Sequence, residues 1–150
     1  MPNSENPQFC IFVDGSSRGN PGPSGVGIAV FAPEGDEAVA QISKYIGITT
    51  NNVAEYEAVI HGLKWMAQSG VKRAQLILDS ELVYKQIMGE YRVRSAHIAL
   101  LMKRIRMLQS DLDLTVTLVP REENKLANRL AQKASKKVKV KPQKFKQLPM

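Results

Sequence analysis

The chain has 150 residues, 43% of them hydrophobic, which is ordinary for a globular protein and predicts one domain with a single core. Its single cysteine, Cys10, lies in an apolar run, so an intramolecular disulfide is excluded and a cysteine-based zinc site is not expected. The first ten residues contain neither a basic segment nor a long apolar stretch. We therefore expect no signal peptide and no association with a membrane, and we predict a cytoplasmic protein.

The positive charge is concentrated at one end of the chain. The formal net charge is +7; residues 133–150 contain seven lysines and no acidic residue, and the other 14 basic residues balance the 14 acidic ones. We therefore divide the chain into a domain at 1–137 and a basic tail at 138–150. Such a tail either keeps a protein soluble or attracts polyphosphate without sequence specificity.

Hydrophobic periodicity and turn signals predict the element order β-β-β-α-β-α-α-β-α, an α/β fold in which helices flank a mixed sheet. The glycine- and proline-rich segment 16–24 is typical of a loop, and a short turn at 33–36 favours an antiparallel hairpin. The expected strands are 9–14, 25–31, 38–46, 73–79 and 112–119, and the expected helices are 50–70, 80–88, 95–109 and 122–136. The first helix is expected to face the core with Val53, Tyr56, Val59, Ile60, Leu63, Met66 and Ala67.

Three acidic residues stand at the ends of predicted elements. Asp14 ends the first apolar run, Asp79 ends the run Leu76–Leu78, and Glu55 lies in the first turn of the first helix. If the two runs are neighbouring strands, Asp14 and Asp79 project from the same region of the sheet, and a helix packed on that sheet can bring Glu55 to them. Clustered carboxylates repel each other and need a counter-charge, which hard divalent cations with oxygen ligands supply.

Each of these residues also has a purely local explanation. Asp14 and Gly15 could form a turn, Glu55 could complete a capping box with Asn52, and Asp79 could be the N-cap of the next helix. A carboxylate pair could also perform general acid–base catalysis, although no feature of the sequence marks one member as protonated. The coincidence of all three at one edge of the predicted sheet favours the metal-site interpretation.

Four segments resemble, in the same order, the signature blocks of type 1 ribonuclease H, and the resemblance extends over about residues 8–136. It implies a ribonuclease H-like fold, with a five-stranded mixed sheet whose first three strands are antiparallel. The blocks are Asp14-Gly15 with Gly19-Asn20-Pro21-Gly22-Pro23, then Thr50-Asn51-Asn52-Val53-Ala54-Glu55, Leu78-Asp79-Ser80 and Arg121-Glu122-Glu123-Asn124-Lys125-Leu126-Ala127.

The resemblance implies an endoribonuclease that hydrolyses the RNA strand of RNA/DNA hybrids with two magnesium ions, or manganese as a substitute, and leaves 5′-phosphate products. In such sites one ion activates water and the other stabilises the leaving oxygen. By analogy Asp14 would bridge both ions, and Glu55 and Asp79 would hold the ion on the leaving-group side. Glu55 would also lie near a ribose 2′-hydroxyl, the group that distinguishes RNA from DNA.

The chain departs from the family pattern at a fourth catalytic and metal-binding position. The family usually has Ala-Asp-x-Leu-Ala in its last helix, whereas this chain has Asn128 in place of the aspartate. The amide keeps an oxygen donor but loses a full negative charge, so we expect weaker binding of the water-activating ion and a slower enzyme. Two other interpretations stay open, namely that Asn128 is an introduced substitution or that the protein binds hybrids without cleaving them.

The resemblance also assigns residues to the substrate. The residues expected to contact it are Gly15, Gly19, Asn20, Asn51, Asn52, Ser80 and Arg121, with the asparagines reaching the minor groove and Arg121 reaching a phosphate. Small residues and amides suit this groove because it is wide, shallow and lined by 2′-hydroxyls. His61 and His97 are expected to be surface or packing residues, because the histidine that many members carry before the last helix is missing.

The partners expected are an RNA/DNA hybrid and, as an open alternative, double-stranded RNA, bound by a monomer. The competing function is a binding protein of the same fold with little or no catalysis. Integrases, transposases and resolvases also place carboxylates on such a sheet, so the fold alone does not decide the function. The lysine-rich tail is expected to hold nucleic acid, in which case deleting 138–150 raises the Michaelis constant and flattens its salt dependence.

Overall fold

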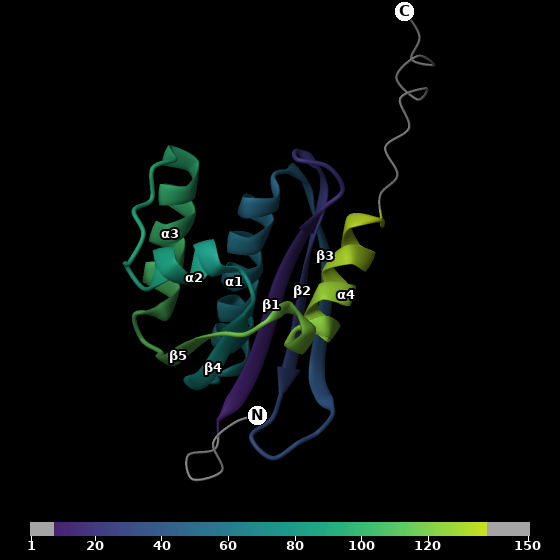
Figure 1. Ribbon diagram of the computed structural model, residues 1–150. Coiled ribbons are helices and arrows are strands. Elements are labelled where there is room, and N and C mark those ends of the chain that lie inside the picture. Colours follow the sequence, from purple (N-terminus) through teal and green to yellow (C-terminus); the bar gives the residue numbers. More distant parts are fainter. Residues whose placement is uncertain (1–7, 138–150) are drawn as a thin grey trace, which may run out of the picture.

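A five-stranded sheet in the order β3-β2-β1-β4-β5 forms the centre of the protein (Figure 1). The computed structural model describes residues 8–137, and the predicted basic tail lies outside the described residues. The strands are β1 (Phe9–Ser17), β2 (Gly22–Phe31), β3 (Ala38–Thr49), β4 (Arg73–Leu78) and β5 (Asp113–Leu118). The helices are α1 (Asn51–Ser69), α2 (Glu81–Ile87), α3 (Ala96–Gln109) and α4 (Lys125–Ser135), with a short 3₁₀ turn, η1 (Arg121–Glu123), before α4.

The sheet is mixed, as the sequence predicts. Strands β1, β2 and β3 pair antiparallel, whereas β4 runs parallel to both β1 and β5. Helix α1 packs on one face of β1 and β2, α3 packs against α1, and α4 covers the opposite face of β1, β2 and β3 (Figure 1). The predicted α/β architecture, a five-stranded mixed sheet whose first three strands are antiparallel, is therefore confirmed.

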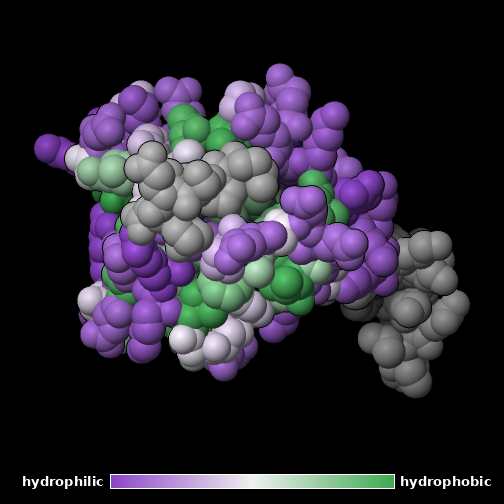
Figure 2. Space-filling view, turned by 90° about the horizontal axis from the view of Figure 1, so that it is seen from below, coloured by the Kyte–Doolittle hydropathy of each residue, from purple (hydrophilic) through white to green (hydrophobic). Residues whose placement is uncertain are grey.

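The main hydrophobic core lies between α1 and the sheet. Ile11 and Val13 of β1 meet Leu63 and Met66 of α1 in one buried cluster. The predicted inner face of α1 is correct except for Ala67, which is exposed like the residues that follow it to the end of the helix. Seen from below, the surface is mostly hydrophilic, with hydrophobic residues visible in patches between the polar ones (Figure 2). Within residues 8–137, no helix combines the length and the apolar character that crossing a bilayer requires.

The loop predicted at 16–24 is wrong in its extent. Strand β1 continues through Asp14 to Ser17, and β2 already begins at Gly22, with Asp14 opposite Gly27 and Ser17 opposite Ser24. Only residues 18–21 form the connection. Glycine, serine and proline are turn signals, but here the small residues stay in the ladder because neighbouring elements approach their backbone closely.

Three predicted helix starts are also corrected. The N-cap of α1 is Thr50, whose hydroxyl accepts from the Val53 N–H, so Asn52 and Glu55 form no capping box and Glu55 lies just beyond the first turn. The N-cap of α2 is Ser80 rather than Asp79. The last helix begins at Lys125 instead of 122, since 121–123 form the 3₁₀ turn. These changes leave Glu55 and Asp79 without the local roles that would otherwise explain them.

Candidate functional site

The sheet and α1 bring the three predicted carboxylates together. Strands β1 and β4 are parallel neighbours with Phe12 opposite Ile77, so Asp14 and Asp79 lie at corresponding points two residues further along. Glu55 reaches the same point from α1, and one carboxylate oxygen from each of the three residues lies within 4.8 Å of the others. Asp14 is therefore not a strand-ending turn residue but a mid-strand carboxylate on the face that carries α4.

Gly15 allows α1 to come close enough for Glu55 to join the cluster. A Cβ atom at Gly15 would lie 2.2 Å from the carbonyl carbon of Ala54, a distance that no side chain tolerates. The Gly15 N–H donates to Oε1 of Glu55 at 3.0 Å. The role predicted for Gly15 on the substrate side is thus accompanied by a packing role, and its backbone orients one of the carboxylates.

Two glycines in β2 allow α4 to approach the sheet closely. A Cβ atom at Gly27 would lie 2.1 Å from the backbone oxygen of Ala127, and one at Gly25 would lie 2.4 Å from Cβ of Ala134. The helix therefore rests directly on the strand backbone and carries Asn128 to the cluster. The Asn128 side-chain Nδ2 donates to Oδ2 of Asp14 at 2.7 Å.

Asn124 is part of the site although the sequence analysis assigned it no function. It is only 1% exposed, and its side-chain Nδ2 donates to the Val13 carbonyl at 2.9 Å and to Oδ2 of Asp79 at 2.8 Å. One signal in the sequence could have found it: Asn124 precedes Asn128 by four residues, a spacing that places two helical side chains on one face.

Burial makes the cluster electrostatically unfavourable without a cation. It raises the pKa of Asp14, and the charge of Asp79 raises it further, whereas the hydrogen bond from Asn128 and the charge of Arg121 lower it. The pKa of Glu55 lies well above its ordinary value because the group is buried and faces Asp14. Within the described part of the chain, Oδ1 of Asp14 is buried and has no hydrogen-bond partner. A hard divalent cation, which prefers carboxylate oxygens, fits this set of donors.

Four of the predicted substrate residues lie in the connection between β1 and β2 or at the start of α1, namely Gly19, Asn20, Asn51 and Asn52. Asn20 and Asn51 meet, since Oδ1 of Asn20 accepts from the Asn51 N–H at 3.0 Å, and Gly19 has a positive φ of 120° in the same short connection. Asn52 lines a pocket of about 490 Å³ together with Tyr91, Arg92 and Arg94 of the segment between α2 and α3.

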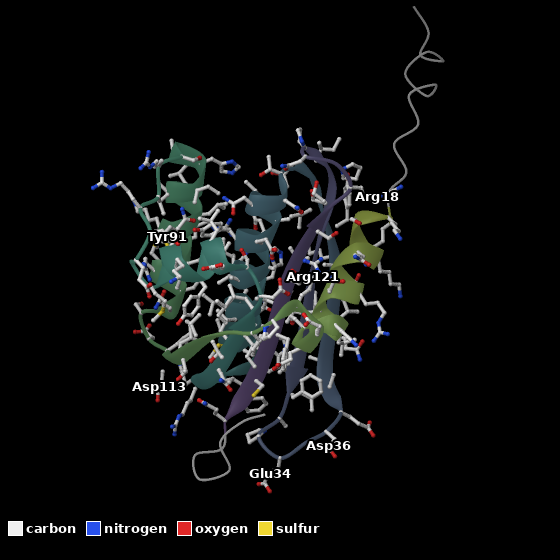
Figure 3. The ribbon with its side chains drawn as sticks, in the orientation of Figure 1. Arg18, Glu34, Asp36, Tyr91, Asp113 and Arg121 are labelled. Atoms are coloured by element: carbon white, nitrogen blue, oxygen red, sulfur yellow. The ribbon has the colours of Figure 1, made fainter. Side chains whose placement is uncertain are left out.

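The other two predicted substrate residues, Ser80 and Arg121, lie at the start of α2 and of η1. The hydroxyl of Ser80 accepts from the Val83 N–H and so caps α2. Arg121 is exposed in η1, close enough for its charge to act on Asp14, and lies near the middle of the view between α2 and α4 (Figure 3).

Neither histidine joins the cluster. His61 is partly buried in α1, where its Nδ1 lies 2.8 Å from the Glu57 carbonyl oxygen, and burial lowers its pKa. His97 is exposed at the start of α3. Both positions agree with the packing and surface roles expected for them.

Comparison with known proteins identifies the family. Residues 12–134 match the family model described as reverse transcriptase-like. The ribonuclease HI of Halobacterium salinarum is 39% identical over 124 residues, and the crystal structure of the RNase H1 from this archaeon superposes with a TM-score of 0.81, covering 85% of this chain and 96% of that one. The chain belongs to the type 1 ribonuclease H family. A further ribonuclease H1, LC11, solved in complex with an RNA/DNA hybrid, is 34% identical, with a TM-score of 0.81 over 87% of this chain and 98% of its own.

Other ribonuclease H relatives are parts of longer proteins. A bifunctional protein of Mycobacterium tuberculosis is 38% identical over 125 residues, which are 83% of this chain but 34% of that protein. The match to the Halobacterium salinarum enzyme likewise spans 62% of its length. The chain therefore spans only part of the length of these relatives.

Proposed function

We propose that this chain is an endoribonuclease that hydrolyses the RNA strand of RNA/DNA hybrids with two divalent metal ions. The observation that carries the proposal is the convergence of Asp14, Glu55 and Asp79 within 4.8 Å, with a buried Asp14 oxygen that has no partner in the described residues. Membership of the ribonuclease H family and the hybrid complex of a relative support the choice of substrate.

The ions would be held by Asp14, Glu55 and Asp79, with Asn128 beside Asp14. Magnesium is the ion we propose, with manganese as a substitute, because both prefer oxygen ligands. When bound, two such ions supply an activated water and stabilisation of the leaving oxygen.

The protein's own contribution is to orient the carboxylates. One oxygen of each is held by an N–H donor: Asp14 by Asn128, Glu55 by Gly15 and Asp79 by Asn124. Oδ1 of Asp14, which has no hydrogen-bond partner among residues 8–137, is left for the cation. Because these donors are fixed by α4 and by β1, the carboxylates need little reorganisation when the cation and the substrate bind.

Asn128 is proposed to attenuate the enzyme. Its amide donates to Asp14, so it partly neutralises that carboxylate instead of adding a fourth negative charge. A site with one charge fewer binds a divalent ion more weakly, and a higher metal concentration is then needed for the same turnover.

The substrate is proposed to lie across the edge formed by Asn20, Asn51 and Asn52, with Arg121 on the phosphate backbone. In support of this, Oδ1 of Asn20 accepts from the backbone N–H of Asn51 at the start of α1, and the pocket that Asn52 lines also contains Arg92 and Arg94. Amides suit the 2′-hydroxyls of the hybrid's minor groove, and arginines suit phosphate. We propose that the domain acts as a monomer.

The test is cleavage of an end-labelled RNA/DNA hybrid over a magnesium and a manganese titration, beside the variants Asp14→Asn and Asp36→Asn. Asp36 is an exposed carboxylate in the turn between β2 and β3, at the lower end of the molecule in Figure 3, and serves as the matched control. We expect metal-dependent cleavage that Asp14→Asn abolishes and Asp36→Asn leaves unchanged.

A second candidate function, a hybrid- or double-stranded-RNA-binding protein, is favoured only by Asn128. Hybrid binding without cleavage at any concentration of either metal would support it and refute the enzyme.

A further inference from the structure

Asn124 connects the two strands that deliver the aspartates. Its Nδ2 carries two protons, and the two acceptors lie on different strands: the Val13 carbonyl, directly before Asp14 in β1, and Oδ2 of Asp79 at the end of β4. No other described side chain bonds to both strands at this point. The same residue begins α4, because its carbonyl accepts from the Asn128 N–H at 3.1 Å.

We propose that Asn124 is a positioning residue that fixes Asp79 relative to Asp14 and so sets the affinity of the site for divalent cations. This inference rests on the proposed function, since it assumes that the carboxylate cluster holds metal. Residues that hydrogen-bond to a metal ligand orient it, and their loss typically costs about 10–100-fold in metal affinity or activity.

The burial of Asn124 supports a specific role. The residue is 1% exposed, and its Oδ1 is buried without a partner among the described residues. A buried amide oxygen without a hydrogen bond is unfavourable, because it has lost its contact with water and gained no other donor. A serine or an alanine would avoid this cost but could not donate two protons in these directions. The protein therefore keeps the unpaired Oδ1 of Asn124 in exchange for the two hydrogen bonds that its Nδ2 donates.

The geometry also explains why Asp79 needs a partner. Asp79 follows the last residue of β4. The hydroxyl of its neighbour Ser80 caps α2 and therefore does not hold Asp79. Among residues 8–137, no other hydrogen bond holds the Asp79 side chain, so without Asn124 none of them would oppose its rotation. With Asn124, Oδ2 of Asp79 is held at 2.8 Å, and the carboxylate stays within reach of Asp14 and Glu55.

The experiment measures metal binding directly. Calorimetric titration with manganese alone, in the absence of nucleic acid, is carried out on the wild type, Asn124→Ala and Asn124→Ser. Ser43→Ala is the matched control: the Ser43 hydroxyl also ties the sheet to α4, by donating to the Leu130 carbonyl at 2.7 Å, but away from the carboxylates. We expect a roughly 10–100-fold loss of manganese affinity in Asn124→Ala, a smaller loss in Asn124→Ser, which retains one donor, and no change in Ser43→Ala.

Hybrid cleavage supplies the second measurement. At saturating metal we expect Asn124→Ala to lower kcat, with KM for the hybrid unchanged within about two-fold, because the groups that hold the hybrid lie elsewhere. Unchanged manganese affinity in a folded Asn124 variant would refute the proposal, as would equal losses in Asn124→Ala and Ser43→Ala. If Asn124→Ala does not fold, the same criteria apply to Asn124→Ser. Manganese binding in a wild type that fails to cleave would refute the proposed function while leaving the role of Asn124 measurable.

Discussion

Replacing Asn128 by aspartate is expected to have opposite effects with and without metal. In the structure the Asn128 amide donates to Oδ2 of Asp14 at 2.7 Å, and Asp14 is 1% exposed. Asn128→Asp removes this donor and places a second carboxylate against the first. In the absence of a cation the two groups repel each other, whereas a divalent cation between them converts the repulsion into additional binding energy.

The magnitude follows from the distance. Two unit charges about 4 Å apart interact by about 4 kcal/mol at an effective dielectric constant of about 20. The lost hydrogen bond to a charged acceptor is worth about 1.5–3 kcal/mol. Protonation of one carboxylate relieves part of the repulsion, at about 1.4 kcal/mol per unit of pKa shift. We therefore expect the metal-free variant to be less stable than the wild type by about 2–4 kcal/mol at neutral pH, a decrease in Tm on the order of 10 °C.

The assay pairs thermal unfolding, with chelator and with saturating magnesium, with hybrid cleavage over a metal titration. With metal we expect the stability difference to vanish or reverse, the magnesium concentration for half-maximal activity to fall tenfold or more, and turnover to rise. Asn128→Ala is the control that removes the donor without adding a charge, and it should weaken metal binding instead. The reasoning is wrong if Asn128→Asp changes neither the metal-free stability nor the metal concentration required for cleavage.

Two further predictions concern the cost of assembling the site. Burial raises the pKa of Asp14 and Glu55, so the folded, metal-free protein binds more protons than the unfolded chain, and its stability falls as the pH rises from about 4 through the raised pKa values. In chelator, Asp14→Asn should thus be more stable than the wild type at about pH 8 and equally stable at about pH 4. Urea unfolding at both pH values measures this. The same difference in unfolding free energy at both pH values would contradict the prediction. Gly27→Ala should displace α4, because the new Cβ would meet the Ala127 backbone oxygen at 2.1 Å, with a loss of about 1–3 kcal/mol and a larger loss of cleavage. Gly35→Ala, whose Cβ would have no neighbour closer than 3.8 Å, should change neither.

The sequence predicted the element order and the three carboxylates because both depend on local patterns. Apolar runs in β1 and β4 and the helical period of α1 are direct consequences of burial, and Asp14, Glu55 and Asp79 follow these patterns in the sequence, although β1 continues beyond Asp14 to Ser17. The family resemblance added Asn128 and the asparagines of the substrate side, which no periodicity indicates. That the chain belongs to the ribonuclease H family agrees with these blocks.

Sequence reasoning was less successful at the element boundaries and in assigning roles to small residues. The segment after Asp14 has the composition of a loop, but β1 continues to Ser17 because the ladder with β2 outweighs local turn preference. Gly15 is indistinguishable from a turn glycine in the sequence, and nothing in the predicted strand 25–31 marks Gly27 as a packing position. Their function, to let α1 and α4 approach the strand backbone, exists only once the helices are packed.

The chain by itself therefore determined which chemical groups are present and in which elements they lie. Only the tertiary structure decided how they act on one another. The bonds from Asn124 to Asp79 and from Asn128 to Asp14 join residues 45 and 114 positions apart. The raised pKa values of Asp14 and Glu55 arise from burial and from charges on other elements. Such interactions depend on distances in space, and residues this far apart in the chain meet only when helices and strands pack around a common core.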